Sequence, residues 1–129
     1  MSLSQVPVAA VIGHPINHSK SPRLHNFWLS NFGVNGYYVP LDIDPRNFEK
    51  HIRSLPRLGF VGANVTIPYK EKILKVADKI SDRAAIIGAA NTLTFLSDGK
   101  IYADNTDGYG FIQNIKSKHK DWTAKDGMS

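Results

Sequence analysis

Three short apolar runs constrain the fold of this chain most strongly. They are closed by turn residues and separated by segments with helical spacing, and they cover Val8–Ile12, Tyr37–Asp42 and Phe60–Val65. Runs of this length with turn residues at their ends are typical of strands in a sheet that is buried on both faces. Pro40 cannot donate to a sheet ladder, so the second strand is predicted to lie at an edge.

Helical patterns follow each of these predicted strands. They combine apolar residues at a spacing of three or four with recognisable start and stop signals, such as a Ser-Pro start and a terminal glycine. The predicted helices are Ser21–Gly33, a segment capped by Asp44 or Asn47 and ended by Pro56 and Gly59, Lys70–Lys79, and a short turn from Ser81 to Gly88.

The sequence pattern of the last part of the chain predicts a β-hairpin followed by a helix. Asn91–Leu96 alternates like a strand, Ser97–Lys100 has the composition of a tight turn, and Ile101–Asp104 pairs back. A final helix begins near Phe111. Strands that alternate with helices, together with one hairpin, predict an α/β fold. We expect a three-layer sandwich with a mostly parallel sheet, one antiparallel strand and helices on both faces.

The composition is that of a globular protein. The chain of 129 residues suits one domain, with 42% hydrophobic and 21% charged residues. No run approaches the roughly 18 apolar residues of a membrane span, and the N-terminus lacks the pattern of a signal peptide. The absence of a long apolar run predicts that the protein does not bind membranes. The absence of cysteine excludes disulfides and thiolate metal sites, so a cytoplasmic protein is expected.

The net charge of +5 does not point to nucleic acid. Much of it comes from lysines in the last segment, and no basic stripe interleaved with aromatic residues occurs elsewhere. A modest positive field favours an anionic small molecule instead. His14, His18 and His25 raise the question of a metal, but Pro15 prevents His14 and His18 from sharing a helical face, so no metal site is predicted.

Uncharged polar residues gather where the predicted strands end. Such ends are where ligands bind in open α/β sheets. Hydroxyls and amides suit a ligand that carries hydroxyl groups, because each buried hydroxyl needs a partner. The two serines precede a predicted helix and therefore suit a carboxylate. The clusters are Ser19 and Ser21, then Asn64, Thr66 and Lys70, then Asn91 and Thr92, and finally Asn105, Thr106 and Asp107.

Each cluster also has a purely structural interpretation. Ser21 can be a helix cap, Asp107 can cap the final helix, and Lys70 can be a solvated lysine. Asn91 and Asn105 can be turn residues, and for Asn105 and Thr92 the structural interpretation is preferred. The rings of Tyr69 and Tyr109 are expected to pack or to form the rim of the cleft.

Four motifs lie between about residue 6 and residue 115. They are Gly13-x-Pro15-x-x-His18-Ser19-x-Ser21-Pro22-x-x-His25-Asn26, Asn64-Val65-Thr66-x-Pro68-x-Lys70, Gly88-Ala89-x-Asn91-Thr92 and Asn105-Thr106-Asp107-Gly108-x-Gly110-Phe111. In this order and spacing, the four motifs together resemble the shikimate dehydrogenase family. The resemblance implies that residues 1–115 form a shikimate-binding catalytic domain. It also implies that residues 116–129 are a truncated connection to an NADP-binding Rossmann domain, whose glycine-rich phosphate loop is missing here.

The resemblance implies reversible NADPH-dependent reduction of 3-dehydroshikimate to shikimate, a step in chorismate and aromatic amino acid biosynthesis. It assigns Lys70 and Asp107 as the catalytic pair. It assigns Ser19 and Ser21 to the substrate carboxylate, and Asn64, Thr66 and Asn91 to the ring hydroxyls. The chain alone is expected to bind shikimate weakly, to lack NADPH binding and activity, and to self-associate through surface exposed by truncation.

Two alternatives to this assignment stay open. A quinate/shikimate dehydrogenase has the same kind of substrate domain, and its choice between NAD and NADP depends on residues outside this chain. A non-catalytic shikimate-binding module uses the same serines and amides but does not require both Lys70 and Asp107. The presence of that pair favours an enzyme.

Overall fold

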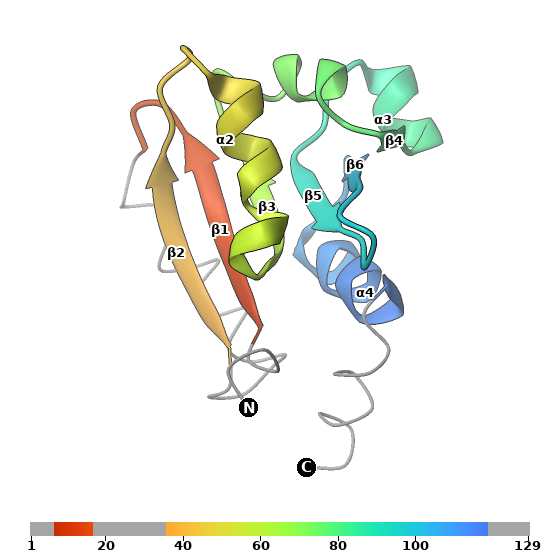
Figure 1. Ribbon diagram of the computed structural model, residues 1–129. Helices are drawn as coiled ribbons and strands as arrows, with labels where there is room; N and C mark the ends of the chain where they lie inside the picture. The colour runs from red at the N-terminus through yellow and green to blue at the C-terminus, as the bar shows by residue number, and fades with distance from the viewer. Residues whose placement is uncertain (1–6, 17–35, 119–129) are drawn as a thin grey trace.

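The computed structural model describes residues 7–16 and 36–118. Figure 1 shows the elements along the chain. The predicted helix between Ser21 and Gly33 lies outside the described residues. The described elements are β1 (Val8–Gly13), β2 (Tyr37–Asp42), α2 (Phe48–Ser54), the 3₁₀ helix η4 (Pro56–Leu58), β3 (Phe60–Val65), the 3₁₀ helix η5 (Lys72–Lys75), β4 (Lys79–Ile80), α3 (Asp82–Ile87), β5 (Thr92–Phe95), β6 (Ile101–Asp104) and α4 (Gly108–Lys118).

One six-stranded sheet organises the fold, with the strand order β2-β1-β3-β5-β6-β4. β1 pairs in parallel with β2 and β3, and β4 pairs in parallel with β6. β5 is antiparallel to both of its neighbours. The prediction of a mostly parallel sheet with one antiparallel strand is therefore confirmed. β2 with Pro40 lies at an edge, as expected of a strand that lacks one donor.

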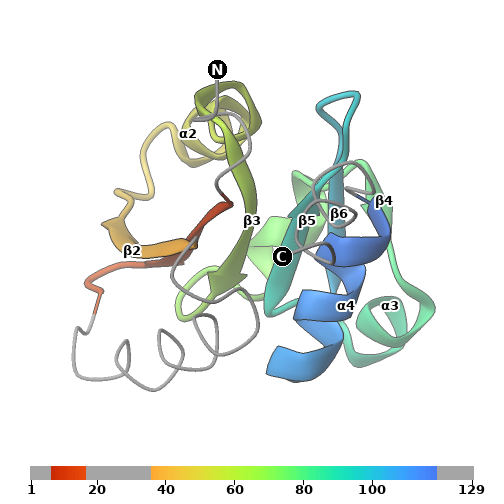
Figure 2. The same cartoon turned by 90° about the horizontal axis from the view of Figure 1, so that it is seen from below.

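Helices cover both faces of the sheet, which confirms the three-layer arrangement. The apolar side chains of α2, Phe48 and Ile52, belong to one buried cluster, and those of α4 belong to a second cluster with Val11 and Val61. Figure 2 shows α2 and α4 on opposite sides of the strands. Because side chains alternate along each strand, Ala10 and Ile12 face the first cluster, whereas Val11 faces the second.

The segment after β3 differs from its prediction. Instead of a helix from Lys70 to Lys79, the chain forms the short helix η5 and then the two-residue strand β4. The backbone N–H of Asp78 donates to Ile101 and that of Ser81 donates to Ala103, at 2.9 Å each. This pairing with β6 pulls residues 78–81 out of the helical path, so tertiary hydrogen bonds override the local helical preference.

The start of α2 also differs in detail from the expectation. Asn47 occupies the N-cap position but in a left-handed conformation (φ 62°), and its side chain makes no capping bond. Asp44 instead accepts from the N–H of Arg46 at 2.8 Å. The predicted cap of α3 is confirmed, since the Ser81 hydroxyl accepts from the N–H of Ala84. No helix in the described part of the chain is long and apolar enough to cross a membrane.

Candidate functional site

The polar clusters within the described residues meet at one edge of the sheet because of the strand directions. The carboxyl ends of β1, β3 and β6 lie at this edge, and so does the amino end of the antiparallel strand β5. A cavity of about 510 Å³ opens there. Its apolar wall includes Val11, Ile16, Val65 and Ile67. The sheet topology thus brings segments that are up to about 90 residues apart in the sequence to a single hollow.

Five of the seven predicted site residues line this cavity: Asn64, Thr66, Lys70, Asn91 and Asp107. Ser19 and Ser21 lie outside the described residues. Among the described groups, the cavity therefore combines two amides, a hydroxyl, an amine and a carboxylate on an apolar background. Such a background with a few polar groups is typical of a site for a small polar molecule.

The backbone around Lys70 is held firmly. The N–H of Thr66 donates to Ile12 at 2.9 Å, and the carbonyl of Lys70 accepts from Ala90 at 2.8 Å. Between them, the buried ring of Tyr69 stacks on Phe48 with centroids 4.1 Å apart, so Tyr69 is a packing residue. Within the described part of the chain, the Lys70 amine has no hydrogen bond or ion pair and is exposed. The backbone at Lys70 is therefore fixed, while the amine keeps its donors for solvent or a ligand.

The amides of Asn91 and Asn64 have defined orientations. Oδ1 of Asn91 accepts from the N–H of Thr106 at 3.0 Å, and Oδ1 of Asn64 accepts from the Tyr38 hydroxyl at 2.7 Å. Burial raises the pKa of Tyr38, so this hydroxyl stays protonated and able to donate. Both oxygens are thus occupied, and each asparagine has its NH₂ group left for a ligand oxygen.

Asp107 has two roles. Its Oδ1 accepts from the N–H of Gly110 at 2.8 Å, which caps the first turn of α4 as the structural interpretation predicts. It also lines the cavity. Gly110 is required at this turn because a Cβ atom there would lie 2.0 Å from Oγ1 of Thr106.

Sequence reasoning missed His14 as a cavity residue, and it placed Thr106 in a polar cluster without assigning it to the site. Nδ1 of His14 lies 2.7 Å from Oδ1 of Asp42, and this hydrogen bond holds the pKa of the Asp42 carboxyl below its usual range. Asp42 also accepts from the N–H of Ile16 at 3.3 Å, so it fixes the turn after β1. The signal that could have identified His14 is its place directly after a strand, whereas the sequence pattern raised it only as a metal ligand.

Two polar residues near the edge are structural, as preferred from the sequence. The Asn105 amide donates to the carbonyl of Ala89 at 3.0 Å. Thr92 is buried and its hydroxyl donates to the carbonyl of Asp104. Neither lines the cavity. Nowhere in residues 7–16 and 36–118 do three or more His, Cys, Asp or Glu side chains group so as to hold a metal ion.

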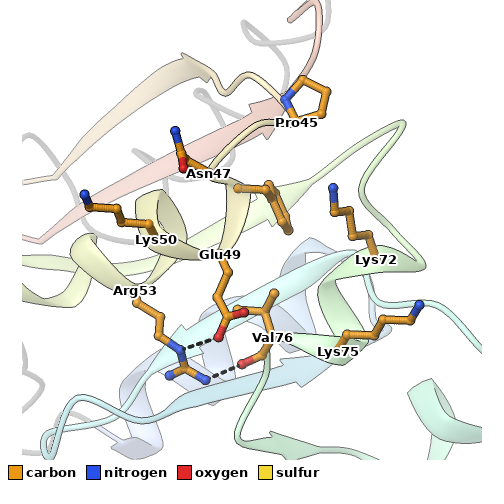
Figure 3. Close-up of a pocket in the computed structure, with 9 residues that line it drawn as sticks. Pro45, Asn47, Glu49, Lys50, Arg53, Lys72, Lys75 and Val76 are labelled. Atoms are coloured by element: carbon orange, nitrogen blue, oxygen red, sulfur yellow. Dashed lines mark hydrogen bonds and ion pairs between the residues drawn. The ribbon is translucent and has the colours of Figure 1, made fainter.

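A second hollow, of about 660 Å³, lies between α2 and η5. Figure 3 shows that the amines of Lys50, Lys72 and Lys75 point in different directions around it. The Arg53 guanidinium donates to the Glu49 carboxylate at 3.2 Å and to the carbonyl of Val76 at 2.8 Å. The second bond ties α2 to the end of η5. The positive charges do not converge, so this hollow lacks the geometry of an anion site.

Fold and site together define a class of protein: an α/β domain with a polar cavity, suited to a small oxygen-rich molecule, at one edge of its sheet. Residues 11–93 match the family model described as the shikimate dehydrogenase substrate binding domain. The chain belongs to this family.

Curated relatives with high sequence identity are named shikimate dehydrogenase (NADP(+)). The NADP(+) shikimate dehydrogenase of Roseobacter denitrificans is 56% identical over 127 residues, which are 98% of this chain and 46% of the relative. That of Paracoccus denitrificans is 59% identical over 116 residues, 90% of this chain and 41% of the relative. The chain thus spans less than half the length of these curated relatives.

Solved structures share the fold. Shikimate dehydrogenase from Aquifex aeolicus superposes with a TM-score of 0.72 at 38% identity, over 91% of this chain and 44% of that one. The enzyme from Thermus thermophilus, solved in complex with NADP(H) and shikimate, gives a TM-score of 0.69 at 36% identity, over 86% and 42% of the two chains. At these identities the similarity extends beyond the fold to the family.

Proposed function

We propose that this chain is the substrate-binding domain of an NADP-dependent shikimate dehydrogenase, which reversibly reduces 3-dehydroshikimate to shikimate. One observation carries the proposal: Lys70 and Asp107, which the resemblance assigns to the chemistry, line the same cavity as Asn64, Thr66 and Asn91. A substrate-binding module without chemistry does not need an amine and a carboxylate at the same wall. The absence of cysteine agrees with a cytoplasmic location for this activity.

The substrate ring is proposed to bind through its oxygen atoms. Three donors are available at the cavity: the NH₂ groups of Asn64 and Asn91, which are free within the described residues, and the Lys70 amine. Each is proposed to donate to a ring hydroxyl, which accepts through a lone pair of its oxygen. The Thr66 hydroxyl can donate or accept. Ser19 and Ser21 are proposed to bind the substrate carboxylate at the start of the helix predicted after β1.

Lys70 is proposed to move the proton of the reacting hydroxyl. Oxidation of an alcohol to a ketone removes a hydride from carbon and a proton from oxygen. The Lys70 amine accepts that proton in one direction and returns it to the carbonyl oxygen in the other. Asp107 is proposed to orient Lys70 and to share the proton. The hydrogen-bonded backbone on both sides of Lys70 fixes the point from which its side chain reaches the cavity, which supports this role.

The described residues do not fit NADP. A dinucleotide is bound by a glycine-rich turn between a strand and the start of a helix. The turn after β1 is Gly13-His14-Pro15 and the turn after β3 is Thr66-Ile67-Pro68, and neither has this spacing. NADP, which supplies or takes up the hydride, is therefore proposed to be bound by a second domain that lies outside this chain.

A chimera tests the proposal. The chain is joined to the remaining part of the Roseobacter denitrificans enzyme, and NADPH formation is followed with shikimate or with quinate as the substrate. We expect turnover of shikimate with NADP and much less with quinate. A folded chimera that binds NADP but oxidises neither compound contradicts the proposal, and equal use of both compounds identifies a quinate/shikimate dehydrogenase instead.

A further inference from the structure

Asp104, at the end of β6, is the most extensively hydrogen-bonded carboxylate in the described part of the chain. Its side chain is 1% exposed, yet it is charged. Arg83 binds it through a two-pronged contact, with Nε on Oδ1 and Nη2 on Oδ2 at 2.7 Å each. The Ser81 hydroxyl donates to Oδ1 at 2.7 Å, and the Asn114 amide donates to Oδ2 at 2.8 Å. Asp104 therefore connects β6 to both α3 and α4.

Asp104 also accepts hydrogen bonds from both polar segments at the cavity edge, the loop after β6 and the segment at Asn91. Its Oδ1 accepts from the N–H of Asn105 at 2.7 Å, which fixes the first peptide of the loop that leads to Asp107. Its carbonyl accepts from the N–H of Asn91 at 3.0 Å. The N–H of Thr106 then donates to Oδ1 of Asn91, so the two segments close on each other beside Asp104.

We propose that Asp104, held by Arg83, is a positioning residue for the ligand-binding edge. It sets the loop 105–107 against Asn91, and thereby fixes both the Asn91 amide and the Asp107 carboxylate at the cavity wall. Asp104 itself does not line the cavity and acts only through these neighbours. The role of the edge in binding shikimate rests on the proposed function.

The geometry of the contact, rather than the strength of the ion pair, supports a positioning role. The Arg83 side chain is 55% exposed, so solvent screens much of its attraction to the buried Asp104 carboxylate. What a two-pronged contact adds is geometric definition, since Arg83 and Asp104 satisfy each other in only one relative orientation. The Arg83 contact also holds the pKa of the Asp104 carboxyl well below its usual range, so the pair stays charged at neutral pH.

Two matched variants test this inference. Arg83→Lys keeps the charge but removes the two-pronged contact with Asp104. Arg46→Lys makes the same change at an arginine that contacts both carboxylate oxygens of Asp44 and lies outside the cavity lining. For each variant, amide hydrogen exchange is measured at Thr106 and at Ile73, whose N–H donates to the Tyr69 carbonyl within the first buried cluster. Shikimate affinity is measured by calorimetry on the same samples.

In Arg83→Lys we expect exchange at Thr106 to accelerate on the order of tenfold relative to Ile73, because the opening is local. Shikimate affinity falls by about fivefold or more in parallel, a loss worth roughly one hydrogen bond. Arg46→Lys leaves the exchange ratio and the affinity unchanged. Asp104→Asn, which removes the acceptor for one prong, produces a larger change in the same direction.

Equal acceleration at Thr106 and Ile73 in Arg83→Lys overturns the inference, because the pair then only stabilises the fold. An unchanged exchange rate at Thr106 overturns it as well. If the unmodified chain binds no shikimate, the proposed function fails, but the exchange ratio still decides whether Asp104 positions the loop.

Discussion

At the scale of single residues, the account depends most on Lys70. Its backbone is fixed on both sides, its amine is unpaired within the described residues, and it lines the cavity. In the chimera, Lys70→Ala is expected to lower kcat by at least roughly 10²-fold with little change in KM, because general acid–base catalysis contributes on this scale. Steady-state kinetics with shikimate measure both constants.

Lys72→Ala is the matched control for that prediction. Lys72 follows two residues later on η5, and its amine lies over the ring of Phe48 at 5.3 Å, outside the cavity lining. Its removal leaves kcat within about twofold of the unmodified value. A normal kcat together with a large rise in KM for Lys70→Ala would remove Lys70 from the chemistry and leave it as a binding residue.

Tyr38 provides a second prediction at this scale. Its hydroxyl occupies Oδ1 of Asn64 and so turns the amide NH₂ group to the ligand. Tyr38→Phe keeps the buried ring but removes the donor, and we expect shikimate affinity to fall roughly two- to tenfold, the range of one net hydrogen bond. The neighbouring Tyr37, which is 59% exposed, supplies the control Tyr37→Phe. Calorimetry showing equal affinities for both variants would contradict the role of Tyr38.

At the scale of elements, β3 tolerates no side chain at Gly62. A Cβ atom there would lie 2.6 Å from the carbonyl oxygen of Leu93 on β5 and 3.0 Å from the ring of Phe111 on α4. Gly62→Ala is therefore expected to lower the free energy of unfolding by about 1–3 kcal/mol, the usual cost of overpacking. Denaturant titration measures this. Ser97→Ala in the exposed hairpin turn is the control, with an expected change within about 0.5 kcal/mol.

The sequence predicted those elements whose signals are local. The apolar runs identified β1, β2 and β3, and Ser81 and Gly88 identified both ends of α3. It did not predict β4, because Lys79 and Ile80 become a strand only through pairing with Tyr102 and Ala103 on β6. The lysine-rich segment before β4 has helical spacing, and nothing within it signals this distant partner.

The same limit applies to the candidate site. Asn64, Thr66, Lys70, Asn91 and Asp107 belong to polar clusters at the ends of predicted strands, and the family resemblance then assigned them to the site. Asp104 was missed, because in the sequence it is only the last residue of a strand. Its importance depends on Arg83 and Asn114, which reach it from two different helices.

At the scale of the whole molecule, thermal stability is expected to fall at acidic pH. The pKa of Asp104 is lowered in the folded chain by Arg83, and that of Asp44 is lowered to about 2 by Arg46. A carboxyl whose pKa is lower when folded contributes stability above its unfolded pKa, near 3.9, and this contribution is lost as the pH falls towards the folded pKa. Thermal unfolding should therefore show a Tm that is flat from about pH 7 to pH 5 and falls below about pH 4.

The variant Asp104→Asn tests whether the Asp104 carboxyl is the main source of this loss of stability at acidic pH. It lowers the Tm at neutral pH, and its Tm then changes less between pH 5 and pH 3 than that of the unmodified chain. If the two chains lose Tm in parallel over this interval, the carboxyl of Asp104 is not the source of the acid sensitivity.

The most direct test of the account is to determine where on this domain shikimate binds. In a titration of the isotope-labelled chain with shikimate, two-dimensional NMR spectra follow the backbone and side-chain amide signals. We expect the largest shifts at the side-chain NH₂ groups of Asn64 and Asn91 and at the backbone of Thr66 and Asp107, which line the 510 Å³ cavity. Shifts confined to Lys50, Lys72 and Lys75 around the other hollow, or no shifts at millimolar shikimate, would contradict it.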